Sequence, residues 1–137
     1  MDKFAYEQDF LISIGADKAP ILKALVAKQK PKTIVELGGY LGYSAILFAE
    51  SMRLVSSKRD EKFQLWSLEF DPKFAAIATK IVALAGLSDM VTVVTGPSLE
   101  SLRKLVAEKR LKHIALLFLD HVEDLYKQDL KLSLIHI

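Results

Sequence analysis

The chain has 137 residues, of which 51% are hydrophobic and 26% are charged, a composition typical of one globular domain and too short for two. The net charge is +2 and the charges are scattered, so no nucleic-acid-binding patch is implied. The absence of cysteine excludes disulfides and thiolate metal sites, and three histidines without regular spacing argue against zinc.

The N-terminal segment is expected to be helical. Residues 1–12 place apolar side chains among polar ones, and Gly15 breaks this pattern. A second helix is expected over about residues 19–28, with Pro20 in its first turn, and Pro31 ends the helical pattern. The first residues lack the apolar region of a signal peptide, and no apolar stretch approaches the roughly 18 residues of a membrane span. We therefore expect a cytoplasmic protein without a membrane partner.

From residue 33 onwards, short apolar strands alternate with helices. The expected strands are residues 33–37, 63–68, 91–95 and 114–119, and the expected helices are residues 43–52, 72–85 and 98–110. Asp71 and Ser98 are expected to cap the last two helices. The fourth strand is apolar throughout, as in strands that are covered on both faces.

This alternation predicts an α/β fold with a parallel sheet, right-handed crossovers and helices on both faces. Ligands of such sheets bind at the carboxyl ends of the strands, near the point where the strand order reverses. The residues at the strand tips are therefore the candidates for a functional site.

The first strand carries Glu36 next to its last residue and is followed by a glycine-rich turn, Gly38-Gly39-Tyr40-Leu41-Gly42, and by Ser44. Glycines allow a sharp turn and the close approach of a ligand. The following helix would direct its free N–H groups at that ligand, where they favour a carboxylate. The alternative is a plain turn between a strand and a helix.

A dinucleotide is the competing ligand for this turn. Its fingerprint needs glycines at relative positions 1, 3 and 6, whereas Tyr40 stands at the third position here. A pyrophosphate therefore fits poorly, and Glu36 suits an ammonium or sulfonium ligand better than phosphates. A NAD-dependent oxidoreductase nevertheless remains the second hypothesis.

The other strand tips also carry candidate residues. Glu69 directly follows the second strand and is positioned to accept hydrogen bonds from both hydroxyls of a ribose, although a surface glutamate is the alternative. The turn before Ser98 either borders an adenine ring or is an ordinary turn with a helix cap. The fourth strand delivers Asp120 and His121, and the carboxylate is the kind of ligand that suits magnesium.

Together these motifs resemble the catechol O-methyltransferase family, and a microbial or fungal member is expected. The resemblance rests on residues 36–45, on Glu69-Phe70-Asp71-Pro72 and on Phe118-Leu119-Asp120-His121, and it extends from about residue 7 to residue 126. It implies a Rossmann-like methyltransferase sheet that binds S-adenosylmethionine and Mg²⁺ and methylates one hydroxyl of a catechol or a related small phenol.

The resemblance also implies roles for particular residues. The methionine part of the cofactor would be surrounded by Ile14, Glu36, Tyr40 and Ser44, in a loop shaped by Gly38 and Gly42. The ribose would be held by Glu69, and the adenine would lie near Ser98 and His121. The cofactor-binding set is completed by Tyr43, Phe70 and Asp120, and Asp120 would also bind magnesium. The metal would chelate both catechol oxygens and lower the pKa of the attacking hydroxyl.

One departure concerns the catalytic base. The family usually continues Asp-His with Trp-Lys, and the lysine is credited with taking the hydroxyl proton. Val122 and Glu123 stand there in this chain, and Glu123 is the candidate replacement base. This departure keeps a third hypothesis open, a non-catalytic relative that binds the cofactor.

The end of the chain also departs from the family, which continues with a further strand that carries an Asp-Asn pair. Residues 132–137 match a reading frame of a transposon-end adapter used in sequencing libraries, although a genuine apolar tail is the alternative. We expect residues 1–131 to be an incomplete methyltransferase domain, truncated after the fourth strand. Magnesium prefers about six oxygen ligands, so this fragment alone is expected to be a poor enzyme.

Overall fold

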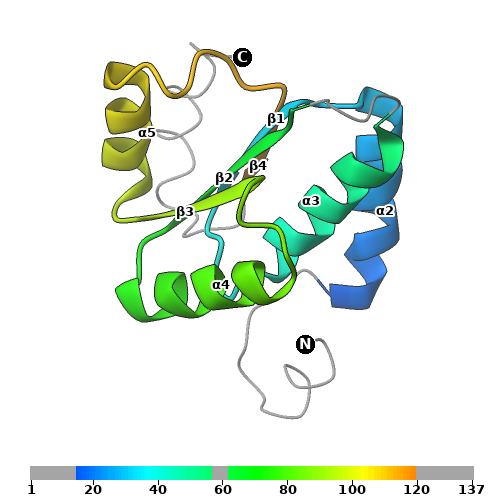
Figure 1. Ribbon diagram of the computed structural model, residues 1–137, viewed down its shortest axis with the longest axis horizontal. Helices are drawn as coiled ribbons and strands as arrows, with labels where there is room; N and C mark the ends of the chain where they lie inside the picture. Colours follow the sequence, from blue (N-terminus) through cyan, green and yellow to red (C-terminus); the bar gives the residue numbers. More distant parts are fainter. Residues whose placement is uncertain (1–14, 57–61, 120–137) are drawn as a thin grey trace.

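The computed structural model describes residues 15–56 and 62–119, which form a four-stranded parallel sheet with helices on both faces (Figure 1). The strands are β1 (Thr33–Leu37), β2 (Gln64–Glu69), β3 (Val91–Thr95) and β4 (Leu116–Leu119). Their order in the sheet is β3-β2-β1-β4, and all three pairings are parallel. The strand order reverses between β1 and β4, and the predicted α/β fold with a parallel sheet is confirmed.

Two of the strands match the predicted bounds, and the other two differ at their ends. β2 begins and ends one residue later than expected, while β4 begins at Leu116 rather than at residue 114. Ala115 still pairs with β1, because its N–H donates to the carbonyl of Thr33 at 3.1 Å. Side chains of β4 pack against the hydrophobic clusters on both faces of the sheet, as expected, although all four residues are only half-buried. Within the described residues β4 has a single neighbouring strand.

The first described helix, α2, spans Gly15–Gln29 and differs from the prediction. Gly15 is the first described residue of this helix, so it starts earlier than expected, and Pro20 lies inside it rather than in its first turn. The expected helix over residues 1–12 lies outside the described residues and stays a prediction. Proline removes one backbone hydrogen bond and is usually confined to the first turn. Pro20 is exposed, so it is accommodated on the solvent side of the helix, close to its N-terminal end.

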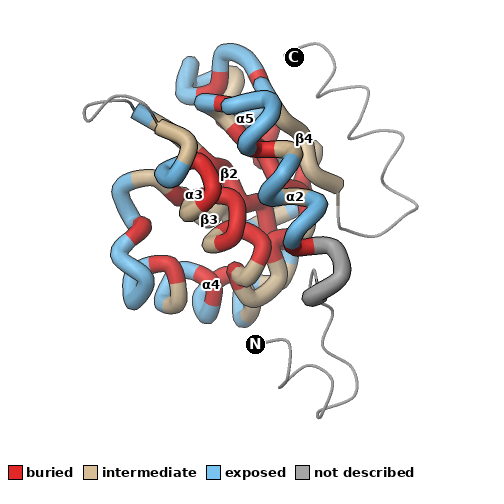
Figure 2. The backbone as a smooth tube through the Cα atoms, turned by 90° about the vertical axis from the view of Figure 1, so that its right-hand side faces the viewer, coloured by how far each residue is buried: buried red, intermediate tan, exposed pale blue. Residues whose placement is uncertain are grey.

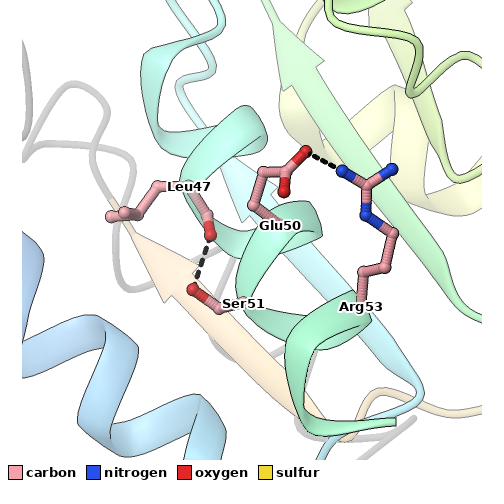
Figure 3. A network of polar contacts seen from close by, with 4 residues as sticks. All are labelled: Leu47, Glu50, Ser51 and Arg53. Carbon is pink, nitrogen blue, oxygen red and sulfur yellow. Dashed lines mark hydrogen bonds and ion pairs between the residues drawn. The ribbon is translucent and has the colours of Figure 1, made fainter.

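Helix α3 (Tyr43–Val55) packs one face against the sheet and carries polar side chains along its outer side. Figure 3 shows two of its local contacts: the hydroxyl of Ser51 donates to the carbonyl of Leu47 at 2.7 Å, and Arg53 pairs with Glu50 at 2.5 Å. Ion pairs of this kind on a helix surface contribute about 0.2–0.5 kcal/mol. The stability of α3 therefore comes mainly from its buried face.

Helices α4 (Pro72–Leu84) and α5 (Ser98–Ala107) begin differently. Asp71 caps α4 as predicted, because its carboxylate accepts the N–H of Lys73 at 2.8 Å. The predicted cap of α5 is wrong: Pro97 occupies the cap position, and Ser98 is the first helical residue. The proline fixes its own φ at −58°, so Ser98 enters the helix directly.

Two hydrophobic clusters fill the two faces of the sheet. On one face, α2, α3 and α4 cover a cluster that includes Phe48, Met52 and Leu65; on the other, α5 covers a cluster that includes Trp66, Leu68 and Leu105. Figure 2 shows the buried residues concentrated on the strands and on the inner sides of the helices. Side chains alternate between the faces along a strand, so Glu36 and Ser67 point to the α3 and α4 side.

Within the described residues, no helix combines the length and the apolar character that crossing a membrane requires. The predicted boundary at residue 131 and the segment 132–137 lie outside the described residues and stay predictions.

Candidate functional site

The side chain of Glu36 lies fully buried at the carboxyl end of β1, and two serine hydroxyls donate to it. Ser44, in the first turn of α3, donates to Oε2, and Ser67 on β2 donates to Oε1 at 2.6 Å. Transferring a carboxylate out of water is costly, and hydroxyl donors offset part of that cost. The structure thus brings together two predicted cofactor-binding residues, Glu36 and Ser44, and adds Ser67 to them.

Ser67 was not among the predicted site residues. It is fully buried in an otherwise apolar stretch, and the parallel register places it directly beside Glu36. The signal in the sequence is a polar residue between two buried apolar ones, Trp66 and Leu68. That signal becomes informative only when the pairing of β1 with β2 is known, because the two residues are 31 positions apart.

Glu69, at the tip of β2, joins the turn after β1 to the turn after β2. Its Oε2 accepts the backbone N–H of Tyr40 at 2.6 Å, and its Oε1 accepts the backbone N–H of Asp71 at 3.0 Å. Glu69 is 8% exposed, so the alternative of an ordinary surface glutamate is wrong. The carboxylate is held in place at the strand tip by two backbone donors.

The glycine turn packs closely against β2 and α4. The N–H groups of Gly38 and Gly39 both donate to the carbonyl of Leu68, at 2.8 and 3.2 Å. Gly42 has a φ of +90°, and a Cβ there would lie 3.2 Å from the Cα of Ala78. A side chain on Gly42 would therefore be strained by the backbone and would crowd α4, which would have to shift by a few tenths of an ångström.

Gly39 is constrained by a neighbouring side chain. A Cβ on Gly39 would lie 2.1 Å from Oγ of Ser67 and 3.3 Å from Oε1 of Glu36. The space was expected to serve a ligand, but this direction is filled by the Ser67 hydroxyl. Gly39, Ser67 and Glu36 therefore form one closely packed unit.

Tyr40 contacts the rest of the protein through both its backbone and its ring. Its φ of +49° is left-handed, its N–H is bound by Glu69, and its ring meets that of Phe74 edge to face at 4.6 Å between centroids. Phe74, on α4, was not predicted as a site residue. Tyr40 thus fixes the position of the turn between two acidic strand tips.

The remaining predicted residues lie outside the hydrogen bonds described above for Glu36 and Glu69. Phe70 is 71% exposed beyond the tip of β2, where it is accessible to a ligand, whereas Ser98 is buried at the start of α5. Tyr43 packs against Ala19 and Leu47 between α2 and α3. The predicted residues Ile14, Asp120, His121 and Glu123 lie outside the described residues.

Residues 3–135 match the model of a family described as O-methyltransferase. The catechol O-methyltransferase of Bos taurus is 34% identical over 132 residues, which are 96% of this chain and 46% of the relative. The catechol O-methyltransferase of Sus scrofa is 38% identical over 116 residues, which are 85% of this chain and 59% of the relative.

Among solved structures, an O-methyltransferase from Bacillus cereus in complex with SAH superposes with a TM-score of 0.83 at 27% identity. The match covers 96% of this chain and 56% of that structure. The chain therefore spans about half the length of the proteins that it matches.

Proposed function

The chain belongs to the O-methyltransferase family, and from this premise we propose that the full protein transfers a methyl group from S-adenosylmethionine to a hydroxyl of a catechol or a related small phenol. The observation that carries the proposal is the pair of carboxylates at neighbouring strand tips. Glu36 and Glu69 lie on either side of the glycine turn, and both are held by hydrogen bonds.

The methionine end of the cofactor suits the surroundings of Glu36. Its ammonium group is a cation, and the buried carboxylate of Glu36 is an anion that two hydroxyls already orient. A charge-assisted hydrogen bond in such a dry environment is stronger than a neutral one. Glu36 is thus the group that would bind the ammonium.

The carboxylate of the same methionine suits the start of α3. The N-cap residue is Gly42, which has no side chain with which to cap the first turn. The free N–H groups of a helix start favour an anion, and the helix dipole adds to this preference. Glu36 at the end of β1 would therefore bind the positive ammonium group of the methionine, and the start of α3 would bind its negative carboxylate.

The ribose of the cofactor suits Glu69. An ionised carboxylate offers about four lone-pair positions, and the two backbone N–H groups occupy two of them. The two hydroxyls of a ribose would find acceptors in the remaining positions. Phe70, the exposed neighbour, offers an aromatic face to the adenine that follows.

A dinucleotide suits the same turn poorly. The backbone N–H of Tyr40, which a pyrophosphate would need, is already bound by the carboxylate of Glu69. A phosphate at that place would face a negative charge. The match to the O-methyltransferase family favours the same conclusion over the alternative of a NAD-dependent oxidoreductase.

When bound, S-adenosylmethionine supplies an electrophilic methyl group on its sulfonium centre. The proposal includes Mg²⁺ with Asp120 as a ligand and Glu123 as the base that takes the hydroxyl proton. All of these residues lie outside the described part of the chain. A non-catalytic protein that binds the cofactor is the second candidate, because Glu123 stands where the family usually has a lysine.

A transfer assay with labelled methyl groups tests the proposal. The protein, at the full length that its gene encodes, is mixed with S-adenosylmethionine and either catechol or phenol, with Mg²⁺ or with EDTA. We expect label in the catechol product with Mg²⁺ and little label with EDTA. Cofactor binding without any transfer would favour the non-catalytic candidate, and binding of NAD instead of S-adenosylmethionine would refute the proposal.

A further inference from the structure

Ser67 forms a hydrogen bond to which the proposed function assigns no role. Its hydroxyl donates to Oε1 of Glu36, from a strand position with no exposed surface. Ser67 and Glu36 are both 0% exposed, and the hydroxyl of Ser67 bonds to the carboxylate, so Ser67 can influence a ligand by orienting Glu36. The two side chains come from adjacent strands in register, which fixes the distance between their backbones.

The neighbouring Gly39 leaves room for this hydroxyl and for little else. A Cβ at Gly39 would lie 2.1 Å from Oγ of Ser67, closer than any stable contact between these atoms. The φ of Gly39 is not in the left-handed region, so its backbone alone does not demand glycine. What demands glycine at this position is the hydroxyl of Ser67 together with Oε1 of Glu36.

We propose that Ser67 is a positioning residue for the methionine end of S-adenosylmethionine. Its hydroxyl orients the carboxylate of Glu36 toward the ammonium group, and Gly39 preserves the space that this orientation needs. The inference rests on the proposed function, because it assumes that Glu36 binds the cofactor. It adds a specificity-determining hydrogen bond that lies behind the binding residue.

The orienting role predicts an effect that depends on the ligand. S-Adenosylmethionine carries the amino-acid end, whereas 5′-methylthioadenosine has the same nucleoside without it. A mispositioned Glu36 should weaken binding of the first ligand and leave the second unchanged. A merely structural role of Ser67 would weaken both ligands alike, because it would disturb the sheet that carries the whole site.

The test is a calorimetric titration of both ligands into the protein at the full length that its gene encodes. In Ser67→Ala we expect the Kd for S-adenosylmethionine to rise about tenfold and the Kd for 5′-methylthioadenosine to stay within about twofold. Ser51→Ala is the matched control. Ser51 is also a buried serine whose hydroxyl donates one hydrogen bond, but it lies in α3 and bonds to Leu47 (Figure 3).

Gly39→Ala is the second variant, and it keeps the hydroxyl in the chain. The added methyl group should rotate the Ser67 side chain away from Glu36, since Oγ is the atom that it would meet. We expect the same selective loss of S-adenosylmethionine affinity, and no further loss in the double variant.

The proposal is overturned if both variants bind S-adenosylmethionine like the wild type, or if both lose the two ligands equally. A wild-type protein that does not bind S-adenosylmethionine would instead overturn the proposed function, and the inference with it.

Discussion

The backbone N–H of Tyr40 donates to Oε2 of Glu69 at 2.6 Å, across 29 residues of chain. This bond joins the turn after β1 to the tip of β2 and holds Tyr40 in a left-handed conformation. The same carboxylate is the proposed acceptor of the ribose hydroxyls. Glu69 therefore connects the shape of the glycine turn to binding of the nucleoside.

Replacing Glu69 with glutamine should weaken binding of the cofactor. The amide oxygen could still accept one backbone N–H, but the amide NH₂ would then face the other donor. We expect the Kd for S-adenosylmethionine to rise about tenfold or more, measured by calorimetry. Glu50→Gln is the control, because Glu50 pairs with Arg53 on α3, away from the strand tips. Equal affinities of Glu69→Gln and wild type would contradict the assigned role.

Replacing Gly42 with alanine should destabilise the protein more than the same change at Gly86. Both glycines have positive φ, +90° and +73°, so both variants pay a backbone cost of about 1–2 kcal/mol. The Cβ at position 42 would in addition lie 3.2 Å from Ala78, whereas the Cβ at position 86 would meet no atom within 4 Å. We expect losses of about 2–4 kcal/mol for Gly42→Ala and about 1–2 kcal/mol for Gly86→Ala in urea unfolding.

Equal losses in the two glycine variants would show that the contact between the glycine turn and α4 is looser than described.

The bounds of the regular elements could largely be predicted from the sequence, because they depend on local patterns. Two short stretches that are rich in β-branched residues, 33–37 and 91–95, predicted the limits of β1 and β3. The start of α2 could not be predicted in this way. Gly15 and Pro20 both disfavour the interior of a helix, yet the helix includes them near its N-terminal end.

The candidate site could be predicted in part. Glu36, Ser44 and Glu69 follow from their positions at strand tips and helix starts. Ser67 could not be found, because its role depends on the register between two strands that lie far apart in the sequence. The hydrogen bond from the backbone N–H of Tyr40 to Glu69 could not be predicted either, because it depends on the path of the turn, which the spacing of the glycines does not specify.

Removing the ring of Phe48 should cost far more stability than removing the side chain of Leu54, although both residues lie on α3. Phe48 is 1% exposed and packs edge to face against Phe118 at 5.2 Å, whereas Leu54 is 80% exposed. We expect a loss of about 3–5 kcal/mol for Phe48→Ala and less than about 0.5 kcal/mol for Leu54→Ala, measured by chemical unfolding. Similar losses would mean that α3 does not present this face to the sheet.

Removing the N-cap of α4 should lower the free energy of unfolding by less than removing the ring of Phe48. Asp71 accepts the N–H of Lys73 at 2.8 Å, so Asp71→Ala should lower the free energy of unfolding by about 1 kcal/mol. Asparagine caps helices about as well as aspartate, so Asp71→Asn should retain wild-type stability. A loss of the same size in both variants would indicate that the charge of Asp71, rather than its capping bond, stabilises the protein.

The central claim is that acidic side chains at the tips of β1 and β2 build a pocket for a sulfonium nucleoside with an amino-acid end. Its most direct test is the affinity of Glu36→Gln for S-adenosylmethionine, measured by calorimetry on the full-length protein. Glutamine keeps the shape of the buried side chain and removes its charge. The account predicts a Kd at least about tenfold above that of the wild type. An unchanged Kd in a folded Glu36→Gln variant would contradict it.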